Sequence, residues 1–286
     1  MVFSPIQVAG IRLTVAGIIL LPWVIKYSIY LPYISPKKQT QNLQIKDYLW
    51  LMASGVFGNA IPAYFFATAG RHIPSGLSGV LNAFTPMFTL LLGICLFKEK
   101  MTKQGAIGVF LGLIGAIFLF VPSIINTQQS INPIGALMPL MSAVLYGLNI
   151  NIIKNKFGHL PGMVKTAYPF FFVGILYSVV LLNTDLKSIW DAYPGPFEFY
   201  EHGKPINANT AFTYLFALGF VGSAVSMIIF NYVIKFTSAV VASTNTFIIP
   251  ITAVILGFFD SETLYWNTVV GMFFLLTAVY LIIKKR

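Results

Sequence analysis

The chain of 286 residues is too apolar for a water-soluble protein of its size. Hydrophobic residues make up 57% of it and charged residues only 9%, whereas about 25% of the residues of a soluble domain are charged. The composition therefore predicts a protein whose solvent is lipid. In lipid every span must pair its own backbone polar groups, so apolar runs of about 20 residues form helices.

Nine such runs follow one another along the chain. They cover roughly 6–25, 48–69, 75–97, 104–121, 133–153, 166–182, 213–234, 238–259 and 266–283. The first run is interpreted as a span and not as a signal peptide. No basic segment precedes it, Arg12 interrupts it, and no small-residue cleavage site follows it.

Lysine and arginine gather on one side of the predicted spans. The loops of that side carry fourteen basic and two acidic residues, whereas the other side carries three basic and six acidic ones. Because loops rich in Lys and Arg stay in the cytoplasm, we expect the C-terminus on the cytoplasmic side of the inner membrane. With nine spans, the N-terminus then lies on the outer side. The net charge of +10 thus requires no nucleic acid as a partner.

The sequence contains an internal repeat. A shift of 164 positions places Gly55 on Gly219 and Pro86 on Pro250, and a shift of 163 continues the match through the following span. The expected topology puts equivalent loops of the two copies on opposite sides of the membrane, so the repeat is inverted. Inverted repeats pack about a pseudo-two-fold axis and place a substrate site near the bilayer midplane.

One segment carries a family likeness. The sequence IPSGLSGVLNAFTP at 73–86, with its continuation to 99, resembles the EamA-type domain of the drug/metabolite transporter superfamily. Residues 236–281 are similar to the same domain more loosely. The resemblance implies a ten-helix bundle of two five-helix inverted repeats, which exports or exchanges metabolites or drugs by alternating access.

We therefore expect an all-α fold, a polytopic membrane helix bundle of two inverted EamA-type repeats at 1–121 and 133–286. The second repeat has five predicted spans and the first only four, so nine spans are present of an expected ten. Pro5 and Pro161 open similar spans, which makes the counterpart of 133–153 the missing first helix. Either the true start lies upstream or the protein has a genuine nine-helix form.

The segment 183–210 is predicted to be a long outer loop. It carries five aromatic residues among four acids. Two interpretations stand: a lid, or a solvated loop whose aromatic side chains rest on the lipid headgroups.

Two prolines interrupt equivalent spans near mid-depth. Pro86 lacks an N–H, so the carbonyl of Asn82 loses its helical partner, and Pro250 does the same to the carbonyl of Thr246. Unwound backbone at this depth is tolerated where it lines a cavity or is covered by protein, so Asn82 and Thr246 are candidates for substrate binding. The alternative is a simple kink, in which a neighbouring Ser or Thr hydroxyl satisfies the freed carbonyl.

Arg12 is the one charged residue well inside a predicted span. It lies about two turns, roughly 10 Å, from the outer end, where a buried arginine is costly. Its planar fork could bind a substrate carboxylate or phosphate. Alternatively, it could turn outward and hold the bundle together through carbonyl and hydroxyl groups.

Further polar residues inside the spans complete the candidate substrate site. Tyr146 and Asn149 share one face of a predicted helix because they are three positions apart. Tyr64 and Asn231 lie on spans that the repeat makes equivalent, and Asn245 lies on the span that the second proline breaks. Any of these side chains could instead form interhelical hydrogen bonds that stabilise the bundle.

The sequence contains no recognisable catalytic or cofactor-binding pattern. The three histidines lack metal-ligand spacing, no phosphate-binding glycine loop is present, and no Asp or Glu lies inside a predicted span. We therefore expect no enzyme, no metal and no cofactor. A proton relay through a buried carboxylate is not expected either.

The predicted function is transport of a small metabolite or drug-like solute, by export or exchange and without ATP. An integral membrane enzyme and a non-transporting membrane scaffold are the alternatives. The expected partners are a small-molecule substrate and the lipid bilayer, and a homodimer is left open.

Overall fold

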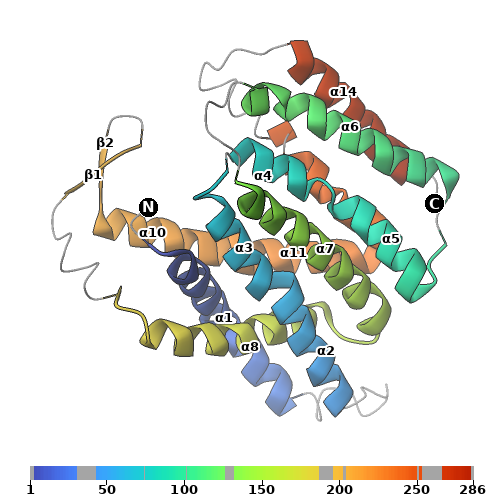
Figure 1. Cartoon of the computed structure of the whole chain (residues 1–286). Coiled ribbons are helices and arrows are strands. Elements are labelled where there is room, and N and C mark those ends of the chain that lie inside the picture. The colour runs from blue at the N-terminus through green and yellow to red at the C-terminus, as the bar shows by residue number, and fades with distance from the viewer. Residues whose placement is uncertain are drawn as a thin grey trace. The chain divides into compact units, whose positions relative to one another are not determined.

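Helices dominate the part of the chain that the structure describes (Figure 1). The computed structural model describes residues 3–30, 43–73, 75–100, 102–125, 132–186, 196–201, 204–249, 251–252 and 266–284. Each of the nine predicted spans contains an apolar helix within these residues. Six helices are long and apolar enough to cross a membrane, and three shorter apolar helices occupy the other three spans. The expected polytopic helical fold is confirmed.

The helices follow in chain order, and several of the spans consist of two or three consecutive pieces. They are α1 (Pro5–Tyr30), α2 (Ile45–Gly55), η1 (Val56–Ala60), α3 (Ile61–Ala69), α4 (Ser75–Asn82), α5 (Thr85–Phe97), α6 (Lys103–Ile125), α7 (Pro133–Lys156), α8 (Gly162–Leu182), α10 (Ala208–Gly219), η2 (Phe220–Val225), α11 (Ser226–Phe236), α12 (Ala239–Ser243) and α14 (Trp266–Ile283). The pieces η1 and η2 are π-helices, which continue the preceding helix with wider turns.

The predicted loop 183–210 contains an antiparallel hairpin that the sequence analysis did not predict. Strand β1 (Pro196–Glu201) pairs with β2 (Lys204–Asn207), with Glu201 opposite Lys204. Strand β1 has the sequence PFEFYE and is rich in aromatic residues, which favours a strand. Trp190 and Tyr193 of the same segment lie outside the described residues.

The chain forms two compact units, and both draw on the two halves of the sequence. The first unit contains Met1–Ala67 and His159–Tyr232, and the second contains Thr68–Gly158 and Val233–Arg286. The units therefore do not follow the sequence domains proposed at 1–121 and 133–286. Each unit combines helices of one expected repeat with the equivalent helices of the other.

The first unit is built around an antiparallel crossing of α1 and α8. A Cβ atom at Gly17 would lie 3.2 Å from the Cα of Gly174, and a Cβ at Gly174 would lie 3.2 Å from the Cα of Gly17. These residues are 157 positions apart, as are the first residues of α1 and α8. The contacts therefore align Pro5 with Gly162, one residue after Pro161, with which the sequence comparison aligned it. Small residues let the two backbones approach closely.

The repeat also relates two contacts that lie on either side of this crossing. A Cβ at Gly55 would lie 2.7 Å from the carbonyl oxygen of Pro169 on α8, and a Cβ at Gly219 would lie 2.8 Å from that of Arg12 on α1. Gly55 and Gly219 are equivalent by 164 positions, and Arg12 and Pro169 by 157. Exchanging the two halves therefore maps one contact onto the other, as an internal two-fold axis requires.

The π-helices obey this symmetry as well. The shift of 164 positions places Val56, the first residue of η1, on Phe220, the first residue of η2. In a π-turn the backbone hydrogen bonds join residues five positions apart instead of four, and such turns are rare. Two of them at equivalent positions cannot be explained by apolar composition, so they support the internal repeat independently.

The second unit has its own symmetric crossing, between α6 and α14, which lie side by side in Figure 1. A Cβ at Gly115 would lie 2.8 Å from the carbonyl oxygen of Gly271, and a Cβ at Gly271 would lie 2.8 Å from that of Gly115. A Cβ at Gly108 would lie 3.0 Å from the carbonyl oxygen of Ala278. The shift of 163 positions converts the pair Gly108–Ala278 into the pair Gly271–Gly115. The helices are antiparallel and related by a two-fold axis.

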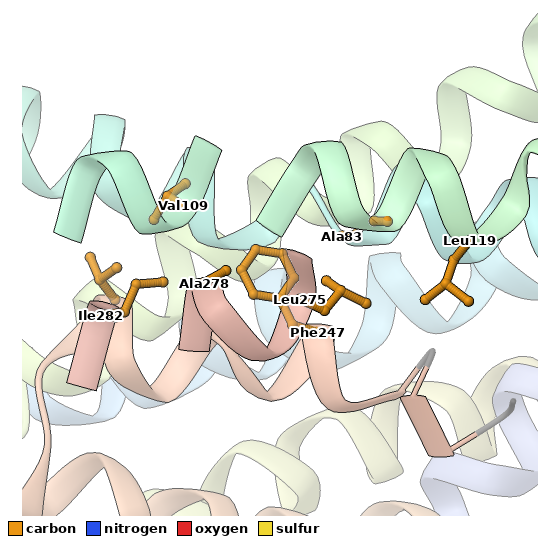
Figure 2. Close-up of a cluster of buried hydrophobic side chains, with 9 residues drawn as sticks. Ala83, Val109, Leu119, Phe247, Leu275, Ala278 and Ile282 are labelled. Carbon is orange, nitrogen blue, oxygen red and sulfur yellow. The ribbon is translucent and has the colours of Figure 1, made fainter. Parts of the chain in front are cut away.

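The core of the second unit fills the space beside this crossing. Figure 2 shows the ring of Phe247 between α6 and α14 with Leu275 next to it, while Val109 and Leu119 of α6 lie toward the two ends of the same buried cluster. The ring occupies the position of a Cβ at Gly112, so this glycine makes room for it. Phe247 and Leu275 are completely buried. Burial of large side chains at this crossing fixes how α6 and α14 meet.

Gly271→Ala should destabilise the protein. The new methyl group would meet backbone atoms of Gly115 and Leu119, which cannot rotate away. We expect a cost of about 1–3 kcal/mol, seen as a lower thermal denaturation midpoint of the detergent-purified protein. Gly158→Ala is the matched control, because a Cβ there meets nothing within 4 Å. An equal midpoint for both variants would contradict this account of the crossing.

Candidate functional site

The first predicted helix break is present. Helix α4 ends at Asn82, a turn follows at Ala83 and Phe84, and α5 restarts with the buried Pro86 as its second residue. The Thr85 hydroxyl donates to the carbonyl oxygen of Asn82 at 2.7 Å and lies 3.3 Å from the Oδ1 of Asn82. The carbonyl freed by the proline therefore has a partner, as the kink interpretation proposes. The half-buried Asn82 amide remains beside it.

The second break lies earlier than the symmetry predicts. Helix α12 ends at Ser243, Thr244 forms the turn, and residues 245–249 are helical again. The equivalent of the first turn would be Phe247 and Ile248. Hydroxyl groups again satisfy local carbonyls, since Thr244 donates to Val241 at 2.7 Å and Thr246 donates to Ser243 at 2.9 Å.

The remaining candidates at this break differ in exposure. Asn245 is exposed and Thr246 is half-buried. Pro250 lies outside the described residues. The two breaks are therefore equivalent in kind but not in register, because a threonine hydroxyl ends the second helix about one turn sooner.

Arg12 contacts the second π-helix. Its Nε donates to the Oγ of Ser223 at 2.6 Å, and the Ser223 hydroxyl donates to the carbonyl oxygen of Leu218 at 3.2 Å. Ser223 is 2% exposed and Arg12 is half-buried. The contact joins α1, from the first half of the sequence, to η2, from the second half. No acidic side chain within the described ranges pairs with Arg12; the ion pair found there joins His159 and Asp47 at 3.2 Å.

A corresponding contact holds the first π-helix. The Tyr177 hydroxyl on α8 donates to the carbonyl oxygen of Ala60, the last residue of η1, at 3.0 Å. Tyr64 lies on α3, directly after η1, and is half-buried. Asn59 is the repeat equivalent of Ser223, and its Nδ2 is buried without a hydrogen-bond partner among the described residues. Each π-helix is thus bound by a polar side chain from the other half of the sequence.

Two buried asparagines act as interhelical ties. Asn151 on α7 donates to the carbonyl oxygens of Thr89 at 2.8 Å and Gly147 at 2.9 Å, which binds α7 to α5. Asn231 on α11 donates to the Thr166 hydroxyl at 2.9 Å, and both residues are 1% exposed. Asn231 was predicted as a substrate ligand. Its contact supports the alternative, structural interpretation.

The predicted site residues fall into both compact units. Arg12, Tyr64 and Asn231 belong to the first unit. The second contains Asn82, Tyr146, Asn149, Asn245 and Thr246. Asn149 is buried and Tyr146 is half-buried, and each has an interaction partner.

Sequence reasoning did not name three residues whose side chains bond the first helix break and the two π-helical segments. They are Thr85 at the first break, Ser223 at η2 and Tyr177 at η1. Ser223 had a detectable signal, because the repeat aligns it with Asn59, another polar residue in an apolar span. Tyr177 had none, since it lies among many aromatic residues of α8.

Comparison with known proteins agrees with this fold. The chain is 26% identical to an uncharacterized transporter of Clostridium kluyveri over 279 residues, which cover 96% of this chain and 81% of that protein. It is 25% identical to the uncharacterized inner membrane transporter YedA of Escherichia coli over 262 residues, covering 89% of this chain and 73% of that one.

A solved structure supports the architecture. A crystal structure with 13% sequence identity superposes with a TM-score of 0.67 and covers 99% of this chain and 88% of the other. At this identity the likeness concerns the fold alone.

The family match extends over almost the whole sequence. The model of the EamA-like transporter family matches residues 2–121 and 133–284. Together with the apolar helices and their internal symmetry, this match shows that the chain is a multi-pass membrane protein that belongs to the EamA-like transporter family.

Proposed function

We propose that the protein moves a small solute across the inner membrane by alternating access, as export or exchange and without ATP. The observation that carries this proposal is the pair of π-helices at equivalent positions, each bound by a side chain from the other half of the sequence. A scaffold has no need of interrupted helices in symmetric pairs. Transporters with inverted repeats use such helices to open alternately to each side.

The interruptions provide places at which helices can bend. A π-turn and a broken helix have fewer regular backbone hydrogen bonds than an α-helix, so side-chain hydroxyls supply some of the pairing. Those side-chain bonds, such as the one from Tyr177 to Ala60, can be exchanged at a modest cost in free energy. Two states of similar free energy are what alternating access requires.

The driving force follows from the charges. The predicted spans hold no Asp or Glu, and the sequence lacks a phosphate-binding loop for ATP. We therefore infer facilitated efflux, exchange, or coupling through the substrate itself. The excess of Lys and Arg on one side supports an orientation with the C-terminus in the cytoplasm.

The first test is transport by the purified protein. Comparing extracellular metabolites of cells with and without the gene identifies a solute, whose exchange is then measured in preloaded proteoliposomes. We expect counterflow without ATP and the same rate with and without a pH gradient. A rate that requires the pH gradient, for a solute that carries no proton, would contradict the coupling proposed.

A second test distinguishes the role of the Asn82 side chain in transport from the role of the Thr85 hydroxyl in stability. Asn82→Ala should lower the transport rate on the order of tenfold, the effect of one lost hydrogen bond, with the amount of folded protein unchanged. Thr85→Val should instead lower the thermal midpoint, because it leaves the carbonyl of Asn82 without its partner. Full transport by Asn82→Ala would remove this residue from the site.

A third test addresses the contact between α1 and η2. Ser223→Ala removes the acceptor of the Arg12 Nε, which should cost about 1.5–3 kcal/mol because the donor is charged. Combined with Arg12→Gln, it should add little further loss of stability, since the partner is already gone. Ser226→Ala is the control, because that exposed hydroxyl bonds only carbonyls of its own helical segment among the described residues. Equal losses for both serine variants would contradict a specific contact.

A further inference from the structure

Within the described part of the chain, Arg12 uses little of its hydrogen-bonding capacity. A guanidinium offers five N–H donors in a planar fork, and the described contact uses the Nε–H alone. The Ser223 hydroxyl gives its own proton to Leu218, so it acts as an acceptor toward Arg12 and its orientation is fixed. This contact holds one edge of the guanidinium against η2. The edge formed by the two Nη groups has no acidic partner among the residues that the structure describes.

Among the described residues, no opposite charge compensates that of Arg12. The residue lies about seven positions, or roughly 10 Å, into α1, and neighbouring positions on the helix are apolar. A serine hydroxyl is a neutral dipole and does not balance a full positive charge. A charged group at such depth is costly unless it meets an opposite charge. The sequence provides no acid inside the predicted spans.

A second buried base lies at the other end of the first unit. Lys165, in the first turn of α8, is 5% exposed. The α1–α8 contacts pair Gly10 with Leu181 and Ser28 with Tyr168, so α8 runs antiparallel to α1. Arg12 and Lys165 therefore lie toward opposite ends of this unit. Each end therefore contains one basic side chain that is at least half-buried.

We propose that the transported solute is a small organic anion and that the Nη edge of Arg12 binds its carboxylate or phosphate group. This inference rests on the transport function proposed above and specifies its substrate class. The planar edge matches the two oxygens of a carboxylate or phosphate and binds them with two parallel hydrogen bonds. Ser223 is a positioning residue that orients the guanidinium.

The experiment measures uptake into proteoliposomes that contain the full-length protein. The anionic probes are succinate, glutamate and glycerol 3-phosphate, and ethidium is the cationic probe. Arg12→Gln and Arg12→Lys are compared with Lys26→Gln, which removes an exposed positive charge from the same helix. Size-exclusion chromatography and the thermal midpoint report whether each variant is folded.

We expect the wild type to take up at least one anion and Arg12→Gln to lower its kcat/KM at least about tenfold, because a charge-assisted pair is lost. Arg12→Lys should recover part of this loss, since a point charge replaces the fork. Lys26→Gln should transport normally. Uptake of an anion at equal kcat/KM by wild type and Arg12→Gln would overturn the inference.

Other outcomes separate this inference from the proposed function. Uptake of ethidium without any anion would leave transport intact and overturn the substrate class. Uptake of neither kind of probe would count against transport itself and against the inference with it. If Arg12→Gln does not fold, inhibition of wild-type ethidium uptake by succinate supports an anion site, and its absence overturns it.

The vesicle composition distinguishes a soluble anion from a lipid headgroup. The assays are repeated in vesicles of phosphatidylcholine alone and of phosphatidylcholine with phosphatidylglycerol. The same dependence on Arg12 in both supports a soluble anion. A dependence confined to vesicles with phosphatidylglycerol would assign Arg12 to the lipid and overturn the proposal.

Discussion

The pairing of backbone polar groups in a solvent without water is the constraint on which the rest of this structure depends. It makes the spans helical, and it makes every interruption of a helix expensive unless a side chain replaces the lost bond. The chain meets this cost in the same way at several places. Thr85 bonds the carbonyl released at the first break, and Tyr177 bonds the last carbonyl of η1. At both irregular positions, a hydroxyl group therefore bonds a backbone carbonyl.

Glycines permit the second feature, the close approach of equivalent helices. Gly17 meets Gly174 in one unit, and Gly115 meets Gly271 in the other, each at distances that no larger residue allows. In both units the contact relates one half of the sequence to the other by a two-fold axis. The inverted repeat is therefore visible as reciprocal contacts within each unit, and the two halves are interleaved and do not form separate bodies.

Much of this could be predicted from the sequence, because apolar length and small-residue spacing act locally. The nine spans and the break at Asn82 follow from such patterns. The π-helices could not be predicted, because a π-turn differs little in sequence from an α-turn and depends on packing, here of Gly55 against Pro169 and of Gly219 against Arg12. The turn at Thr244 could not be predicted for a similar reason. It depends on a local hydrogen bond from the Thr244 hydroxyl, and Pro250, on which the symmetry argument rested, lies outside the described residues.

Imperfect symmetry is itself informative about function. Equivalent positions in α1 and α8 carry Arg12 and Pro169, and equivalent positions in the two π-helices carry Ser223 and Asn59. A device that only opened and closed would work with identical halves. The differences concentrate where polar groups contact the π-helices. One π-helix is bound by the charged guanidinium of Arg12, and the other by the neutral hydroxyl of Tyr177. In the proposed mechanism the symmetric backbone supplies the motion, and these few unequal side chains select the solute.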